Sequence, residues 1–301
     1  SKDPEESLIL GTDKEIGGGL MVFNTDGKLI EEKSIVGLAR PNNVDVEYGL
    51  KVNDSVYIDI AVTVERPKEL VRIFSVPEMR AIDSGGFQVF QNEKDTTDRW
   101  PMGVALFKHP NGSISMILSR KSGPTDGTYL WQYRIKAENR DSVSIELIRK
   151  FGNFSGGEGE IEAIMVDDSL GYVYYSDELF GIRKYYADPE KGNEELAIFG
   201  EMDFNRDREG IALWPTSPKD GYILISDQQE NAFNVYPRNP NNHNHKLIKK
   251  LYLSTLDSDG CELIVQPIGT AFPEGAFIAM STDKTFHFYD LRKLKDIIVT
   301  D

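Results

Sequence analysis

Short apolar runs separated by turns recur from one end of the chain to the other. The runs are rich in β-branched and aromatic residues, and turn sequences such as Asp26-Gly27 and Pro110-Asn111-Gly112 lie between them. The sequence has no convincing amphipathic helix apart from a possible helical turn near Leu291 to Leu294. The pattern therefore predicts an all-β chain.

One arrangement of these runs occurs six times. An apolar strand ends in small and polar residues, a loop follows, and a second, aromatic-rich strand begins. The residues at the equivalent strand ends lie 50 to 57 positions apart; they are Lys14, Arg66, Lys121, Glu178, Gln228 and Asp283. A period of ~50 residues with several short strands per unit is typical of β-propeller blades. We therefore predict a six-bladed β-propeller that forms one domain over residues 1–301, with a β-sandwich as the alternative.

A second series of apolar strands precedes the first series within each repeat. It reads NNVDVEYG, PMGVALF, EIEAIMVDD, DREGIALW and DGCELIV, and polar or acidic residues introduce each strand. A sixth member would precede Ser7, where only six residues remain. We therefore expect either that the innermost strand of the first blade lies upstream of residue 1, or that the ring closes differently from the usual arrangement.

The charge balance restricts the partners that such a propeller could bind. The chain of 301 residues has 34 Lys and Arg against 49 Asp and Glu, a net charge of −15, and the acidic residues are scattered. Nucleic acids and anionic membranes are poor partners for this surface. No apolar run approaches the ~18 residues of a membrane span, and no signal peptide is recognisable. Cys261 is the single cysteine, which excludes an internal disulfide and a cysteine-based zinc site.

Equivalent positions of successive blades lie around one rim of a propeller, so the six strand ends should share one mouth. The first three are basic, and the last three are acidic or amide. We expect one cationic half and one anionic half of this mouth. The acidic half would also receive residues that introduce the second series of strands, or lie close to them: Asp45, Glu162, Asp207, Glu209, Asp259 and Glu262.

This division has a chemical interpretation. Carboxylates that cluster without His or Cys are oxygen ligands for hard cations, and Ca²⁺ takes six to eight such ligands. Without a cation the carboxylates would repel one another. Lys and Arg beside bound cations would hold phosphate oxygens, Arg by its planar fork and Lys as a point charge. An acidic protein can thus bind a polyanion through bridging metal.

Three segments of the chain contain motifs that are not unique individually. Their order and spacing along the chain make the combination specific. Residues 162–185 read EAIMVDDSLGYVYYSDELFGIRKY, with an acidic residue, Asp-Asp, a Gly turn, a strand and an acidic pair. Asp207-Arg208-Glu209-Gly210 forms an Asp-x-Glu-Gly motif, and residues 42–45 read Asn-Asn-Val-Asp, followed by Tyr48. In these segments, and over essentially its whole length, the chain resembles the Ca²⁺-dependent β-propeller phytases.

The resemblance implies a hydrolase that acts on phytate or related inositol phosphates, with several Ca²⁺ ions. It also implies an extracytoplasmic protein, and we expect a monomer. Carried over by position, the residues implied to be both catalytic and metal-binding are Glu162, Glu178, Asp207 and Glu209, with Asp45 and Asp259 as further metal ligands. The residues implied to bind substrate are Lys14, Asn43, Arg66, Lys121 and Gln228.

The chain also departs from the family pattern at several places. Glu15 stands where a second Lys is expected, the aromatic residue expected near Met102 is absent, and the loop around Asp283 is short. The family's Asp-Asp-Pro-Ala-x-Trp segment would lie upstream of Ser1.

Two other classes of function remain open from the residues alone. One is a non-catalytic propeller that binds a protein or a glycan, because fold does not decide function. The other is a metal-dependent lactonase or esterase. Lys14, Arg66 and Lys121 favour phosphate, because a neutral substrate gives no reason for three basic residues at equivalent blade positions.

Overall fold

A computed structural model describes residues 3–299, which fold as six antiparallel sheets. The first three sheets contain β1 (Ile9–Asp13), β2 (Gly19–Phe23) and β3 (Ile35–Val36); β4 (Pro41–Asn53), β5 (Val56–Glu65), β6 (Leu70–Val76) and β7 (Phe87–Gln88); and β8 (Pro101–Lys108), β9 (Ile114–Arg120), β10 (Leu130–Asn139) and β11 (Ser142–Phe151). The last three contain β12 (Ile164–Asp167), β13 (Tyr172–Asp177), β14 (Gly181–Tyr186) and β15 (Ala197–Phe199); β16 (Arg208–Pro215), β17 (Gly221–Asp227), β18 (Ala232–Pro237) and β19 (Lys249–Tyr252); and β20 (Cys261–Ile264), β21 (Ala276–Ser281) and β22 (Thr285–Asp290).

Helices contribute little to the described part of the chain. The α-helices are α1 (Thr96–Arg99) and α2 (Leu291–Val299), and the second extends the helical turn that the sequence indicates. The 3₁₀ turns are η1 (Pro4–Glu6), η2 (Glu31–Lys33), η3 (Arg66–Lys68), η4 (Pro189–Lys191), η5 (Gln228–Glu230) and η6 (Asn241–His243). Within residues 3–299, none of the helices has the length and apolar character needed to span a bilayer.

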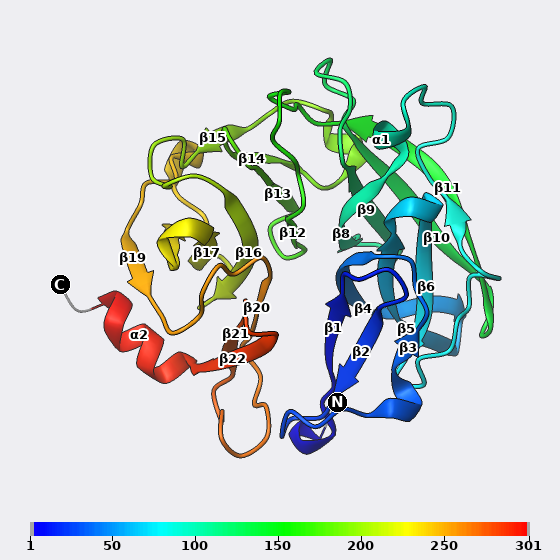
Figure 1. Cartoon of the computed structure of the whole chain (residues 1–301), viewed down its shortest axis with the longest axis horizontal. Helices are drawn as coiled ribbons and strands as arrows, with labels where there is room; N and C mark the ends of the chain where they lie inside the picture. The colour runs from blue at the N-terminus through cyan, green and yellow to red at the C-terminus, as the bar shows by residue number, and fades with distance from the viewer. Residues whose placement is uncertain (1–2, 300–301) are drawn as a thin grey trace.

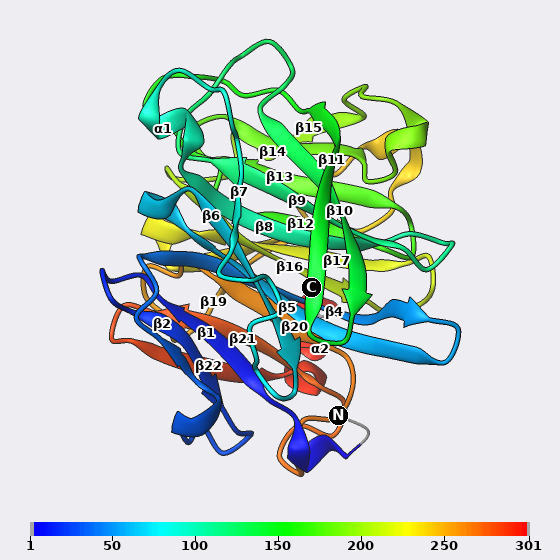
Figure 2. The same cartoon turned by 90° about the vertical axis from the view of Figure 1, so that its right-hand side faces the viewer.

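The six sheets surround a central axis, which confirms the predicted six-bladed β-propeller (Figure 1). Each pair of strands in the sixfold repeat forms a hairpin within one blade, from β1 and β2 to β21 and β22. The five strands of the second series form the innermost strands of five blades: β4, β8, β12, β16 and β20. The first and last sheets lie side by side, with the rings of Phe23 and Phe286 edge-on at 6.2 Å (Figure 2).

The hydrophobic core lies between neighbouring blades, because each sheet packs against a sheet on either side. One apolar cluster joins the second and third blades, with Ile60 and Val62 of β5 against Val104 of β8 and Leu118 of β9. All seven residues of β9 are buried. Strands covered on both faces read as continuous apolar runs instead of alternating ones, which explains the sequence pattern.

Three of the inner strands begin with an irregularity at the same end of the channel. The pairing register shifts between Pro41 and Val44 in β4, between Pro101 and Val104 in β8, and between Arg208 and Ile211 in β16. Such β-bulges redirect side chains and are frequent beside functional sites. The residues in these bulges therefore point differently from those of a regular strand.

A glycine in one bulge permits a close contact between two blades. A Cβ atom on Gly103 would lie 2.0 Å from the backbone oxygen of Glu162, so only glycine fits there without moving the backbone just before β12. The Gly103 N–H donates to Ser119 Oγ at 2.8 Å. The backbone at Glu162 is therefore positioned by the neighbouring blade.

We predict that Gly103→Ala lowers the free energy of unfolding by about 1–3 kcal/mol, because the added methyl overpacks a backbone contact. Gly260→Ala is the matched control, since a Cβ on Gly260 has no neighbour within 4 Å and its φ is not in the left-handed region. Urea unfolding followed by circular dichroism measures both variants. Equal midpoints for the two variants would contradict this account of Gly103.

Candidate functional site

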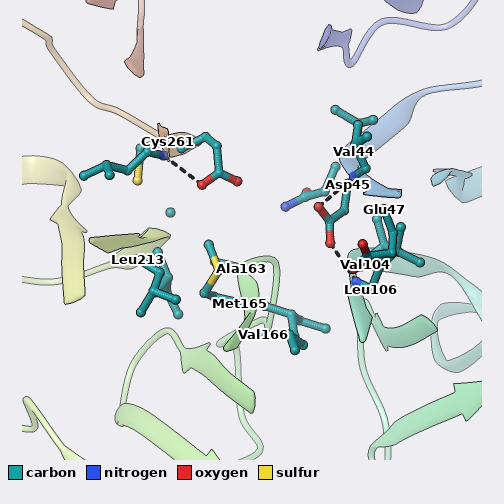
Figure 3. A pocket seen from close by; sticks show the side chains of 18 of the residues that line it. Val44, Asp45, Glu47, Val104, Leu106, Ala163, Met165, Val166, Leu213 and Cys261 are labelled. Carbon is teal, nitrogen blue, oxygen red and sulfur yellow. Dashed lines mark hydrogen bonds between the residues drawn. The ribbon is translucent and has the colours of Figure 1, made fainter. Parts of the chain in front are cut away.

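The inner strands enclose a channel along the propeller axis. Its cavity volume is about 300 Å³, and its walls come from β4, β8, β12, β16 and the segment around β20 (Figure 3). The inner strands follow the channel in the same direction, with Asn43, Ala163, Gly210 and Asp259 toward its start. The side chains near this start form the candidate site.

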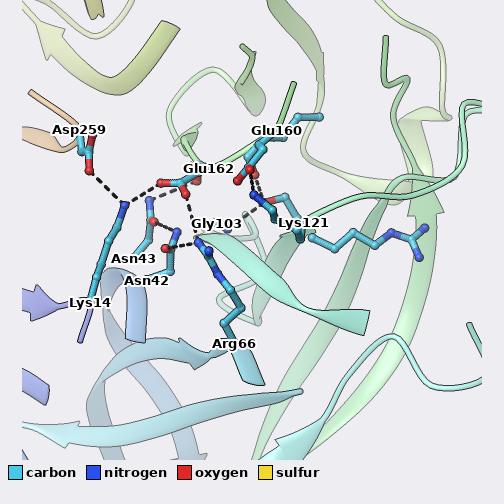
Figure 4. Close-up of polar contacts among 12 residues, drawn as sticks. Lys14, Asn42, Asn43, Arg66, Gly103, Lys121, Glu160, Glu162 and Asp259 are labelled. Carbon is cyan, nitrogen blue, oxygen red and sulfur yellow. Dashed lines mark hydrogen bonds and ion pairs between the residues drawn. The ribbon is translucent and has the colours of Figure 1, made fainter. Parts of the chain in front are cut away.

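Glu162 links two of the basic residues at the channel mouth. Its carboxylate accepts from Lys14 Nζ at 2.8 Å and from Arg66 Nη2 at 3.1 Å (Figure 4). Burial would raise the pKa of Glu162, but Lys14, Arg66 and their hydrogen bonds outweigh burial and hold this pKa below its usual value. Glu162 is therefore ionised in the free protein.

The same ion pairs act on Lys14. Burial opposes its charge, but the carboxylates of Glu162 and Asp259, which accepts at 3.2 Å, raise the pKa of Lys14 above its usual value. Arg66 begins η3 directly after β5 and is only 5% exposed. Its Nη2 also donates to Asn42 Oδ1 at 2.7 Å, and its Nε has no partner.

Two asparagines in the bulge of β4 hold this group together. Asn42 Nδ2 donates to Asn43 Oδ1 at 2.7 Å, and Asn43 Nδ2 donates to the backbone oxygen of Glu162 at 3.2 Å. Thr63 Oγ1 donates to the backbone oxygen of Asn43 at 2.6 Å. In the free protein the Asn43 side chain therefore bonds to Asn42 and to the Glu162 backbone. Its expected contact with substrate stays a prediction.

Lys121 has a different acidic partner from the other two basic residues. It follows β9, and its ammonium forms an ion pair with Glu160 (Figure 4). The Glu160 N–H donates to Glu178 Oε2 at 2.9 Å, which connects this pair to the acidic residues of the site.

Glu178 and Glu209 are buried carboxyls that lack a basic partner among the described contacts. Burial, followed by the charges of Glu162 and Asp207, raises the pKa of Glu178 to about 8. Glu209 is 7% exposed, and its Oε2 has no hydrogen-bond partner. Burial, followed by the charges of Glu162, Glu178 and Asp259, raises the pKa of Glu209 well above its usual value.

Amide side chains hold the remaining acidic residues. Gln229 Nε2 donates to Asp207 Oδ2 at 2.7 Å, and the Asp207 N–H donates to Gln229 Oε1 at 2.8 Å. Gln228, which begins η5, donates from Nε2 to Asp259. Asp259 thereby lies between Gln228 and Lys14.

The expectation of separate cationic and anionic halves is wrong. Glu162 lies between Lys14 and Arg66, and Glu160 holds Lys121, so the charges are interleaved. A partly buried charge is costly unless it is paired, which favours this arrangement. At the sixth strand end, Asp283 is exposed and accepts from Thr285 Oγ1 at 2.6 Å.

Asp45 belongs to a second acidic group further along the channel. It accepts from the N–H groups of Val46 at 2.7 Å and Leu106 at 2.6 Å, and burial raises its pKa to about 6 (Figure 3). Burial likewise raises the pKa of Asp168 to about 8, with Glu47 as the next cause, and that of Glu262 to about 7. The acids expected at one site thus divide between two depths.

The chemistry of the donor atoms at the mouth fits a hard cation. The charge of Asp207 acts on Glu178, the charge of Glu178 acts on Glu209, and Glu209 Oε2, which has no hydrogen-bond partner, is an unused acceptor. Among residues 3–299, however, no group of three or more His, Cys, Asp or Glu side chains lies in an arrangement ready to hold a metal ion. Cation binding there would therefore draw these side chains closer together.

Sequence reasoning missed Glu160 and Gln229, and did not single out Asn42 beside Asn43. Glu160 carries a usable signal, because residues two apart in an extended segment share a side and Glu160 precedes Glu162 by two. Gln229 follows a strand-end residue and has no comparable periodic signal.

Comparison with known proteins bears on this arrangement. The family model described as "Phytase" matches residues 1–287. A curated relative, the 3-phytase of Bacillus subtilis (strain 168), is 25% identical over 291 residues, which are 92% of this chain and 71% of the relative.

Solved structures resemble the chain in fold alone. A protein from Lactobacillus plantarum matches with a TM-score of 0.59 and 13% identity, over 95% of this chain and 79% of that one. The β-propeller domain of Cps50 (Swd1) from Myceliophteria thermophila matches with a TM-score of 0.50 and 11% identity, over 94% and 80%. A luciferin-regenerating enzyme matches with a TM-score of 0.53 and 10% identity, over 95% and 85%.

We predict that Glu178 destabilises the metal-free protein increasingly as pH rises from about 4.5 to about 8. The Glu178 carboxyl has a usual pKa of 4.5 and a folded pKa of about 8, so in this range the folded state binds more protons than the unfolded state. The contribution of Glu178 to the free energy of unfolding must then fall with increasing pH, whereas His245, whose pKa burial lowers to about 3, contributes in the opposite direction below about pH 6.5. Chemical unfolding in a chelating buffer at several pH values measures this slope.

Glu178→Gln should remove this contribution, so that the free energy of unfolding falls less steeply, or rises more steeply, with pH than it does in the wild type. The control is Asp283→Asn: the hydrogen bond from Thr285 lowers the pKa of Asp283, so this group titrates below the window. A Glu178→Gln slope equal to that of the wild type would show that Glu178 is ionised throughout.

Proposed function

The chain belongs to the phytase family, and from this premise we propose that it is a Ca²⁺-dependent phosphoric monoester hydrolase acting on phytate (myo-inositol hexakisphosphate) or related inositol phosphates. The observation that carries the proposal is the convergence, at one channel mouth, of Lys14 and Arg66 with buried carboxyls that have no basic partner. Phosphate and a hard cation are the two ligands that such a mixture suits.

The basic residues would bind the substrate phosphates. Arg66 can present its fork to two phosphate oxygens, and Lys14 and Lys121 can each contact one as a point charge. In the free protein each of the three is held by a carboxylate of the site. During hydrolysis the same cations would stabilise negative charge on the transferring phosphoryl group. Gln228 and Asn43 are further candidates for polar contacts with the substrate.

The carboxylates would hold the cations. Glu178, Asp207 and Glu209 are the proposed ligands at the mouth, with Glu162 and Asp259 beside them and Asp45 deeper in the channel. A bound cation neutralises phosphate charge and lowers the pKa of a bound water. Glu178 and Glu209, whose pKa values are raised in the free protein, would release protons when they bind a cation.

The burial of these groups supports their role. In a site shielded from water, each charge interaction with a phosphate is stronger than it would be at the surface. The hydrogen bonds of Asn42 and Asn43 keep Arg66 and the Glu162 backbone in position before substrate arrives. A monomer that works outside the cytoplasm remains our prediction from the family resemblance.

Phosphate release from myo-inositol hexakisphosphate, with Ca²⁺ and with chelator, tests the proposed function. We expect release that requires Ca²⁺ and that falls by at least about a hundredfold in Glu209→Gln, because the substitution keeps the shape but removes a ligand charge. Asp283→Asn is the matched control, an acidic strand-end residue that contacts Thr285 instead of the site, and it should retain wild-type turnover. Equal turnover of the wild type and Glu209→Gln would exclude Glu209 as a ligand. The absence of any phosphate release by the wild type would contradict the proposed function.

A further inference from the structure

The ion pair between Lys121 and Glu160 has a property that the other ion pairs of the site lack. Glu162, which binds Lys14 and Arg66, also lies among the proposed cation ligands. Glu160 is outside that set, and the contact that its side chain makes in the structure is with Lys121 (Figure 4). Both partners remain partly exposed, Lys121 at 32% and Glu160 at 20%, so a ligand at the mouth can reach them.

The backbone holds Glu160 in place independently of its side chain. The Glu160 N–H donates to Glu178 Oε2 at 2.9 Å, and the Glu160 oxygen accepts from the Glu178 N–H at 3.2 Å. The backbone of Glu178 is held in turn by Arg208, whose Nη1 donates to the Glu178 backbone oxygen at 2.7 Å. The Glu160 carboxylate is therefore presented to Lys121 from a fixed point of the chain.

A carboxylate fixed beside Lys121 affects any anion that uses this ammonium. The anion must displace Glu160 from Lys121 and must also tolerate the negative charge that remains nearby. A ligand with several closely spaced negative charges can replace the lost ion pair by more than one contact. A singly charged anion gains much less from the exchange.

We propose that Glu160 is a specificity-determining residue that competes with the substrate anion for Lys121. Glu160 lowers the affinity of the site for anions in general and restricts binding to densely charged esters. This inference rests on the proposed function, because it takes Lys121 as a phosphate contact. It assigns Glu160 no contact with the reacting atoms.

Titration calorimetry with myo-inositol hexakissulfate in a Ca²⁺ buffer tests the inference, because this probe is polyanionic and has no phosphate ester to hydrolyse. Glu160→Gln should bind the probe about three- to tenfold more tightly than the wild type, which corresponds to the loss of one partly exposed competing ion pair. The substitution keeps the backbone bonds to Glu178. Thermal melting of each variant checks that the fold is intact.

Two further variants separate competition at Lys121 from a general charge effect. Glu158→Gln removes one negative charge from an exposed residue of the same loop and should change the affinity by less than about twofold. In a Lys121→Ala background, Glu160→Gln should have no larger effect than Glu158→Gln, because the competed group is gone.

The outcomes distinguish this inference from the proposed function. If Lys121→Ala weakens binding but Glu160→Gln leaves it unchanged, the competition is refuted while the phosphate-binding role of Lys121 stands. If the wild type and all variants fail to bind the probe, the inference is refuted as well. Tighter binding by Glu160→Gln without any phosphate release from phytate by the wild type would support the competition and refute the hydrolase.

Discussion

The repulsion between buried carboxylates at the mouth of the channel is the constraint on which the site depends. Glu178 and Glu209 lie in each other's field with little access to water, and neither has a basic partner among the described contacts. Their carboxyls keep protons at pH values where exposed ones are ionised. A protein tolerates such a group when a ligand supplies the missing positive charge, and strained electrostatics of this kind occur often at functional sites.

The propeller makes this concentration of charge possible, because its rigid sheets carry the opposing groups on separate blades. Lys14, Arg66 and Glu162 come from three different blades, yet their charged atoms lie within hydrogen-bonding distance. Bulges at the start of β4, β8 and β16 and the close contact at Gly103 fix these positions through the backbone. The blades stay together through their apolar faces, so the polar mouth does not have to stabilise the fold.

The period of the sequence predicts the fold well, because an apolar strand repeated every ~50 residues has few other ways to bury itself. It also predicts that strand-end residues such as Lys14, Arg66 and Lys121 approach one another, since equivalent strand ends share a rim, but the sixth strand end, Asp283, contacts Thr285 instead of the site. It could not predict partners: Glu160 holds Lys121, and Glu162 lies between two cations, because ion pairs across blades depend on side-chain reach. The sequence also could not predict how deep in the channel each acidic residue lies. Asp45 shares a motif with Asn43 but lies two residues further along β4, among other buried acids.

A crystal structure of the protein grown with Ca²⁺, with the ions located by anomalous scattering, tests cation binding at the mouth most directly. We expect Ca²⁺ about 2.3–2.6 Å from carboxylate oxygens of Glu178, Asp207 or Glu209, with these side chains drawn together. Ions found only beside Asp45 and its neighbours, or no ion at a saturating concentration, would contradict the assignment of the mouth as the cation site.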